Sequence, residues 1–232
     1  MKILITAGGT EEPVDGVRRL TNTSTGATGA VIARRFRELG AEVLLLHAER
    51  APLAAVDVER EIFTTFADLE ASLRRHLRNR EWDAVVHLAA VSDYSVASIE
   101  IDGRPVSHGD RGKIGSGGEM TIRLSPNPKL IDSLKTWSRN PKIHVVGFKL
   151  TNDPDEAARE AKVRALLERG GADLVVHNDL AEITHEHHPA VIWIPGGPIM
   201  RTLTKTELAE ALFVMLDGPD IEPRADEGAQ GR

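Results

Sequence analysis

Residues 2–10 have the sequence KILITAGGT, and this stretch decides the fold of the chain. It opens with a short apolar run, which is typical of a buried strand, and two glycines follow where that strand should end. Apolar residues then recur at helical spacing over residues 26–39, and Gly40 stands where a helix C-cap belongs. A strand, a glycine-rich connection and an amphipathic helix together predict the first βα unit of an α/β sheet.

The rest of the chain repeats this alternation of short apolar runs and longer amphipathic stretches. We expect strands near residues 2–6, 42–47, 84–89, 120–124, 144–148, 174–177 and 191–194. We expect helices over residues 26–39, 66–79, 128–137, 154–168 and 205–216. The pattern predicts a three-layer α/β/α, Rossmann-like fold around a mostly parallel sheet.

Residues 99–118 interrupt this pattern. The dipeptide Asp102-Gly103, which follows a short β-branched run, predicts a hairpin. The stretch 108–118 then contains five glycines in eleven residues, which predicts a mobile connection. We therefore expect a hairpin and a flap inserted into the α/β fold.

The composition excludes several classes of site. The chain has 232 residues, a formal net charge of −6 and no cysteine. It therefore has no disulfide, thiolate nucleophile, zinc–thiolate site or iron–sulfur cluster of its own. The net negative charge argues against a nucleic-acid partner. No apolar run approaches the roughly 20 residues that span a bilayer, and the N-terminus lacks the layout of a signal peptide. We expect a cytoplasmic protein with no membrane partner.

One domain is expected over residues 1–216. The remaining segment, residues 217–232, is polar, contains two prolines and has five acidic against two basic residues. This composition predicts a disordered acidic tail.

Two clusters of small, donor-rich residues lie in the connection that follows the first strand. One contains Gly8 and Gly9, and the other contains Ser24 and Gly26 at the start of the expected helix. The insertion between the clusters adds guanidinium and amide groups: Arg18, Arg19 and Asn22. The spacing fits neither a Walker loop nor Gly-x-Gly-x-x-Gly. The clusters predict an anion site at the carboxyl edge of the sheet, and a tight turn followed by a helix cap is the alternative.

The order and spacing of several motifs resemble those of phosphopantothenoylcysteine synthetase, a ligase of coenzyme A biosynthesis. The resembling positions are residues 6–10, 12–13, 15, 17–18, 21–26, 89–94, 112–114, 127–128, 146–148, 162 and 173–179. The resemblance implies that the carboxylate of 4′-phosphopantothenate attacks the α-phosphate of CTP, with loss of pyrophosphate. The amine of L-cysteine then displaces CMP. The resemblance also implies Mg²⁺ with the CTP co-substrate, a homodimer, a separate decarboxylase partner and no flavin.

The resemblance assigns roles to individual residues. Asn22 would hold the acyl intermediate, and Arg18, Asn22, Ser24 and Gly26 would bind the substrate. Lys113 on the flap would act on the phosphates, so that Asn22 and Lys113 are the implied catalytic residues. The implied nucleotide-binding residues are Gly8, Gly9, His87, Leu88, Ala89, Asp93, Lys113, Asn127, Pro128, Lys129, Leu130, Phe148 and Lys162. Metal ligands are not implied.

Simpler alternatives exist for four of these residues. They are a capping or salt-bridged carboxylate for Asp93, a surface position for Lys113, a core position for Phe148 and a solvated helix position for Lys162. The chain also departs from the family pattern. Residues 115–118 (GSGG) replace further flap lysines, Lys129 replaces an aspartate, residues 147–152 (GFKLTN) lack a glutamate, and Leu166 replaces a second helix lysine. Lys129 and Lys149 are candidates to restore the lost positive charge, and the choice between CTP and ATP stays open.

Two other functions are also considered. Gly26-x-x-Gly29 opens a helix, as in NAD(P)-binding oxidoreductases, but the lone tyrosine, Tyr94, has no lysine four residues later. The altered flap would suit a non-catalytic nucleotide-binding protein. A histidine-rich segment, with His185, His187 and His188 near Glu182 and Glu186, is weighed as a metal cluster or as an exposed or structural segment.

Overall fold

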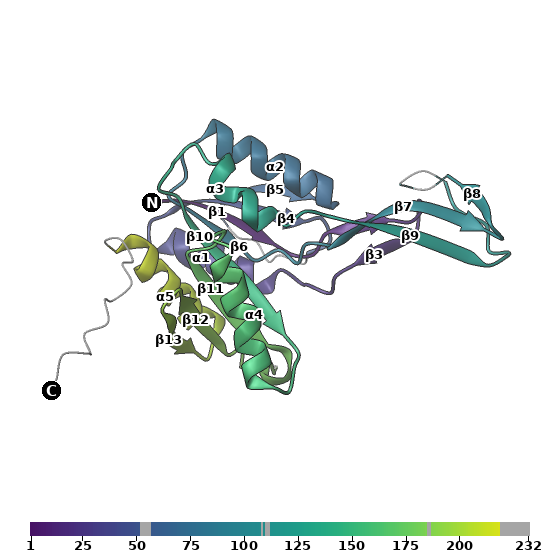
Figure 1. Ribbon diagram of the computed structural model, residues 1–232. Helices are drawn as coiled ribbons and strands as arrows, with labels where there is room; N and C mark the ends of the chain where they lie inside the picture. Colours follow the sequence, from purple (N-terminus) through teal and green to yellow (C-terminus); the bar gives the residue numbers. More distant parts are fainter. Residues whose placement is uncertain (52–56, 108, 110–111, 185–186, 219–232) are drawn as a thin grey trace.

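The computed structural model describes residues 1–51, 57–107, 109, 112–184 and 187–218. Its centre is an eight-stranded sheet with the order β13-β12-β11-β10-β6-β1-β4-β5 (Figure 1). The strands are β1 (Lys2–Ala7), β4 (Glu42–Ala48), β5 (Glu59–Phe63), β6 (Ala84–His87), β10 (His144–Thr151), β11 (Leu174–Asp179), β12 (Ala190–Ile194) and β13 (Gly197–Thr202). The six strands from β11 to β5 are parallel, and β12 and β13 add an antiparallel edge. The expected mostly parallel sheet is confirmed.

Helices cover both faces of this sheet, and each face buries one hydrophobic cluster. One face packs against α1 (Ala27–Glu38) and α5 (Lys205–Asp217). The other packs against α2 (Phe66–Asn79), α3 (Leu134–Trp137) and α4 (Glu156–Glu168). Successive strand residues point to opposite faces, so Leu4 of β1 lies in the α2 cluster while Ile3 and Ile5 lie in the α1 cluster. The three-layer prediction is therefore also confirmed.

Two glycines allow close contacts at the end of β1. A Cβ at Gly29 would lie 2.5 Å from the Cβ of Ala7, so a larger residue would push α1 away from the strand. Gly8 has a φ of 89°, and a Cβ there would lie 2.6 Å from the Cβ of Ala48 at the end of the neighbouring strand β4. The Gly29 contact thus holds α1 against the end of β1, and Gly8 lets the chain turn beside β4.

A three-stranded antiparallel sheet extends away from the central sheet as an arm (Figure 1). It consists of β7 (Tyr94–Ile101), β8 (Arg104–Val106) and β9 (Met120–Pro126). Asp102 and Gly103, both at positive φ, form the expected hairpin turn. The strand expected near residues 120–124 pairs with β7 here and does not join the central sheet, which corrects the sequence-based assignment. Its first four side chains are half-buried and exposed in alternation and the last three are exposed, which suits an antiparallel arm in contact with solvent.

The segment expected to form a helix over residues 128–137 is instead two short turns. A 3₁₀ turn, η1 (Leu130–Ser133), precedes α3 (Leu134–Trp137). Four buried side chains of this segment, those of Leu130, Ile131, Leu134 and Trp137, set its path against the core. Elements that the sequence did not predict are β2 (Glu11–Pro13), β3 (Arg19–Thr21), β5, β13 and the 3₁₀ turn η2 (Leu180–Glu182). Most of them are short or carry exposed polar residues, so they lack a clear apolar run.

Among the described residues, no helix has the length and apolar character needed to cross a membrane. Helix α5 extends to Asp217, one residue past the expected domain boundary, and residues 219–232 of the expected tail lie outside the described residues. His185 and Glu186 of the histidine-rich segment also lie outside them. Within the described part of the chain, no group of three His, Asp or Glu side chains could hold a metal ion.

Candidate functional site

The connections that follow β1 and β6 are joined to each other at the carboxyl edge of the sheet. The backbone N–H of Ala90 donates to the carbonyl oxygen of Gly8 at 2.8 Å. The amide Nδ2 of Asn22 donates to the carbonyl oxygens of Val91 at 3.1 Å and Ala90 at 3.4 Å. A Cβ at Gly9 would lie 2.5 Å from the carbonyl oxygen of Asn22, so glycine lets the two segments meet. Asn22 is therefore exposed at the edge where both connections converge.

The second glycine-rich cluster meets the first one. Gly26 is the buried N-cap of α1 with a φ of 71°, and a Cβ there would lie 3.2 Å from the backbone nitrogen of Gly8. Ser24 is half-buried two residues earlier. The N-cap position of α1 provides no side-chain cap, and the backbone N–H of Ala27 donates to Oγ1 of Thr25 at a long 3.4 Å. Both predicted clusters thus lie at the carboxyl edge, beside a helix start whose N–H groups can donate to an anion.

A cavity of about 340 Å³, here called the β6–β10 cavity, opens at the same edge of the sheet. Eight of the predicted nucleotide-binding residues line it: His87, Ala89, Asp93, Pro128, Lys129, Leu130, Phe148 and Lys162. The other lining residues are Val91, Ser92, Ile131, Lys149, Ala165, Leu166 and Arg169. The fold therefore brings together side chains from β6, β10, η1, α4 and the connection before β7.

His87 lies at the floor of this cavity as a neutral polar group. Its side chain is 7% exposed, and its Nδ1 lies 3.0 Å from the hydroxyl of Thr6. Burial disfavours the charged imidazolium and lowers the pKa of His87 from 6.5 to about 4. The same Thr6 hydroxyl accepts the backbone N–H of Ala89 at 3.1 Å, which fixes the end of β6.

Basic side chains dominate the charge of the cavity lining. Lys129 forms an ion pair with Asp93, the one carboxylate among the lining residues. Arg169 pairs with Asp132 at 2.8 Å. The side chain of Lys149 is half-buried and makes no hydrogen bond or ion pair with any described residue. Three of the four basic groups are paired with carboxylates, so Lys149 leaves an excess of one positive charge, which favours a phosphate.

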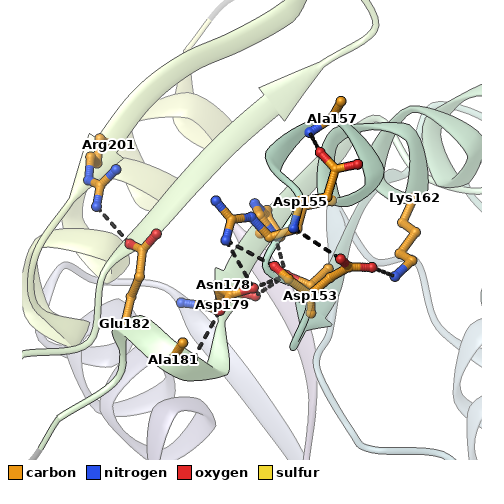
Figure 2. Close-up of polar contacts among 12 residues, drawn as sticks. Asp153, Asp155, Ala157, Lys162, Asn178, Asp179, Ala181, Glu182 and Arg201 are labelled. Carbon is orange, nitrogen blue, oxygen red and sulfur yellow. Dashed lines mark hydrogen bonds and ion pairs between the residues drawn. The ribbon is translucent and has the colours of Figure 1, made fainter.

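Lys162 reaches from α4 toward the ends of β10 and β11, where several carboxylates gather (Figure 2). Its Nζ lies 2.8 Å from Oδ2 of Asp153, and this hydrogen bond lowers the pKa of the Asp153 carboxyl. Figure 2 shows the two side chains pointing at each other beside Asp155 and Asp179. Lys162 thus lines the β6–β10 cavity, and its ammonium group is paired with Asp153 just before α4.

Some predicted residues take other places. Phe148 lines the cavity but packs against the cluster on the α1 face, and Leu88 packs there too. Asn127 donates through Nδ2 to the Ser92 carbonyl at 3.1 Å and accepts from the Ser95 hydroxyl at 3.0 Å. These bonds hold the turn before β7. The α-helix N-terminus expected after Asn127 is absent, because η1 is only a 3₁₀ turn.

The flap brings Lys113 to a different place from the β6–β10 cavity. Lys113 is exposed and lines a separate cavity of about 450 Å³ on the arm, together with Ile101 and Val106. Arg18 lies next to this segment, since its Nη2 donates to the carbonyl oxygen of Ile114 at 2.7 Å. The structure therefore groups Arg18 with the flap, whereas Asp93 and Lys129 lie in the β6–β10 cavity.

Comparison with known proteins identifies the family of this chain. Residues 1–217 match the family model described as the DNA/pantothenate metabolism flavoprotein C-terminal domain. This chain belongs to that family. The Coenzyme A biosynthesis bifunctional protein CoaBC of Thermococcus kodakarensis is 35% identical over 216 residues, which cover 91% of this chain and 50% of that protein. The CoaBC protein of Escherichia coli K12 is 29% identical, over 92% of this chain and 50% of that protein. The chain thus spans about half the length of these curated relatives.

Solved structures agree with this family. The DNA/pantothenate metabolism flavoprotein from Streptococcus pneumoniae has a TM-score of 0.78 and 32% identity, covering 91% of this chain and 96% of that one. A Cab2 H337A mutant in complex with phosphopantothenate-cysteine has a TM-score of 0.74 and 21% identity, covering 93% of this chain and 86% of that one. At 21% identity, the similarity to the Cab2 structure supports only the fold of this chain.

Sequence reasoning missed one residue that lines the β6–β10 cavity, Arg169, and one that supports its lining residue His87, Thr6. Thr6 is fully buried, and only its contact with His87 shows its role. Arg169 follows Lys162 and Leu166 at helical spacing, so the face of α4 that lines the cavity was a usable signal. Thr151 stands at the position where the resemblance implies a glutamate, and its hydroxyl donates to Oδ2 of Asp179 at 2.6 Å. Neither residue lines the β6–β10 cavity.

Proposed function

We propose that this domain is a phosphopantothenate–cysteine ligase of coenzyme A biosynthesis, and that CTP is its nucleotide. One observation carries the proposal: eight residues expected to bind nucleotide line a single basic cavity beside the Asn22 loop. The reaction joins 4′-phosphopantothenate to L-cysteine through an acyl-cytidylate, with release of pyrophosphate and then CMP.

In the first step, a carboxylate oxygen of 4′-phosphopantothenate attacks the α-phosphorus of CTP and pyrophosphate leaves. Negative charge gathers around phosphorus, so fixed cations stabilise the transition state more than a nucleophilic side chain would. Lys149 has no described partner and is free to bind the triphosphate. Lys129 can exchange its exposed partner Asp93, and Lys162 its half-buried partner Asp153, for phosphate oxygens. The neutral His87 offers a polar contact to the base without adding charge.

In the second step, the amine of L-cysteine attacks the acyl carbon and CMP leaves. The Nδ2 group of Asn22 is used on the carbonyls of Ala90 and Val91, so its Oδ1 is left as an acceptor. We infer that Oδ1 binds an N–H group of the acyl intermediate and holds it for attack. Arg18 supplies a guanidinium for the phosphate of the pantothenate substrate, because a guanidinium matches phosphate geometry.

Mg²⁺ fits this site as a companion of the nucleotide. Asp93 is the one carboxylate in the cavity lining, and Mg²⁺ is commonly held by one or two carboxylates together with phosphates and water. When bound, the ion neutralises charge on the triphosphate. No flavin takes part in the proposed reaction, and a separate decarboxylase would act afterwards, on the carboxylate that L-cysteine brings into the product.

We also propose that the domain acts as a homodimer. Several large apolar side chains are exposed on the arm and the adjacent loop: Tyr94 on β7, Leu124 on β9, Leu20 on β3 and Val17. Exposed apolar surface of this kind is typical of a protein interface. The oligomeric state is measured by light scattering on the purified protein.

The proposed function is tested by pyrophosphate release. The protein is incubated with 4′-phosphopantothenate and CTP, ATP or no nucleotide, with and without L-cysteine. Release that requires both 4′-phosphopantothenate and a nucleotide, and is faster with CTP than with ATP, supports the ligase. Absence of release with either nucleotide contradicts it. Binding of CTP without release would support a non-catalytic nucleotide-binding protein, and binding of NADPH would support an oxidoreductase.

A further inference from the structure

Asp15 is a buried carboxylate on which five hydrogen-bond donors converge. Its side chain is 1% exposed. Oδ1 accepts from the backbone N–H groups of Val17 at 3.0 Å and Arg18 at 2.9 Å. Oδ2 accepts from Nε of Arg18 at 2.9 Å, from Nη2 of Arg18 at 2.6 Å and from the backbone N–H of Ile114 at 3.0 Å. The Arg18 guanidinium holds the pKa of the Asp15 carboxyl well below its usual range, so the group is an anion.

These contacts join two segments that are far apart in the sequence. Ile114 belongs to the flap, whereas Arg18 lies between β2 and β3. Nη2 of Arg18 donates to the carbonyl of Ile114 at 2.7 Å, and the backbone N–H of Gly16 donates to the carbonyl of Gly112 at 2.7 Å. Lys113 lies between these two anchored residues. Its backbone is therefore attached on both sides to the loop that carries Arg18.

The bonds to Asp15 also limit what Arg18 can offer a ligand. A guanidinium has five N–H donors. The Nε donor is bound to Asp15, and Nη2 contacts both Asp15 and the carbonyl of Ile114. Nη1 has no hydrogen-bond partner within the described part of the chain. One edge of the guanidinium is thus fixed by the protein, and the two N–H groups of Nη1 remain for an anion.

We propose that Asp15 is a positioning residue that locks Arg18 and the flap main chain at Ile114 into one unit. Arg18 then presents only Nη1 to an anionic substrate, and Lys113 is held at a set distance from that anion. Substrate binding and flap docking are coupled in both directions, because both use the same guanidinium. The ligand is a phosphate monoester, and its identity as 4′-phosphopantothenate rests on the proposed function.

The lock itself is tested without any ligand. Asp15→Asn keeps the shape of the side chain but removes the negative charge and one acceptor oxygen. We expect the backbone amide of Ile114 to exchange with deuterium about tenfold faster or more in this variant. Glu61→Gln is the matched control, since Glu61 accepts from Ser72 at 2.5 Å and from His76 at 2.7 Å on the edge strand β5. Unchanged exchange at Ile114 in Asp15→Asn would overturn the lock, whatever the protein catalyses.

The positioning role is tested by kinetics. In Asp15→Asn, the KM for 4′-phosphopantothenate should rise about tenfold, while the KM for CTP changes less than about twofold, because only the Arg18 anion site loses its orientation. Equal changes in both constants, or no change in either, would overturn this role. Circular dichroism checks the fold. If Asp15→Asn does not fold, Arg18→Lys provides the exchange test, because lysine lacks the second arm that bonds Ile114. A wild-type protein that releases no pyrophosphate contradicts the proposed function alone, since the exchange test stands without it.

Discussion

Acidification should destabilise this protein through His87. The imidazole is 7% exposed, and burial lowers its pKa from 6.5 to about 4. Between these values the unfolded chain binds a proton that the folded protein does not, so the free energy of unfolding falls as the pH falls. Stability is complete above pH 6.5 and is lost progressively down to about pH 4. At about 1.4 kcal/mol per unit of pKa shift, the full loss is about 3 kcal/mol.

The assay is urea-induced unfolding of the wild type and of His87→Gln at about pH 7.5 and about pH 4.5. Glutamine can still contact the Thr6 hydroxyl but does not titrate. The wild type should lose about 2.5 kcal/mol more than the variant over this interval. Lowered pKa values at His177 and His188, which are also caused first by burial, act in both proteins and cancel in the difference. His144→Gln, at the start of the neighbouring strand β10, is the control, and it should lose as much free energy of unfolding over this pH interval as the wild type. Equal losses in the wild type and in His87→Gln would refute the reasoning.

Three further predictions concern the site and the core. Lys149→Ala should raise the KM for CTP about tenfold in the pyrophosphate assay, because it removes the cavity cation that has no partner among the described residues. Lys142→Ala, which removes an exposed lysine before β10, should leave this KM unchanged. Asn22→Asp should slow steady-state pyrophosphate release in the presence of L-cysteine at least about tenfold, with an unchanged circular dichroism spectrum. A carboxylate cannot donate to the carbonyls that Nδ2 contacts, so the side chain no longer holds the acyl intermediate for the second step; wild-type rates would contradict this role. Gly29→Ala should lower the free energy of unfolding in urea titrations by about 1–3 kcal/mol, because the added Cβ would clash with the Cβ of Ala7 between α1 and β1. Gly196→Ala has open space around the added Cβ and should change this free energy by less than about 0.5 kcal/mol.

Much of the fold was predictable because it depends on local patterns. The apolar runs of β1, β4, β6, β10 and β11 are buried on both faces, so each appears in the sequence as a continuous stretch. The capping box at Thr65 and Asp68 likewise marks the start of α2 by local chemistry. Membership of a sheet is different. The apolar pattern of β9 indicated a strand, but it did not indicate the partner of that strand. β9 pairs with β7 in the arm, because both strands lie outside the central sheet.

The candidate site was predictable only in part. Motif resemblance selected eight residues that line the β6–β10 cavity, because motifs at the ends of neighbouring parallel strands meet at one edge. The place of Lys113 was not predictable. It depends on how the flap docks on the Arg18 loop, which is decided by hydrogen bonds between residues about a hundred positions apart.

The sequence by itself determined the α/β/α layering, the glycines at the end of β1 and the family, because hydrophobic period, backbone freedom and motif spacing are local properties of the chain. Only the tertiary structure decided which charges are paired. Asp15 with Arg18, Lys162 with Asp153, and the absence of a described partner for Lys149 follow from distances between separate elements. Electrostatic interaction depends on separation in space and on burial, and neither is set by separation along the chain.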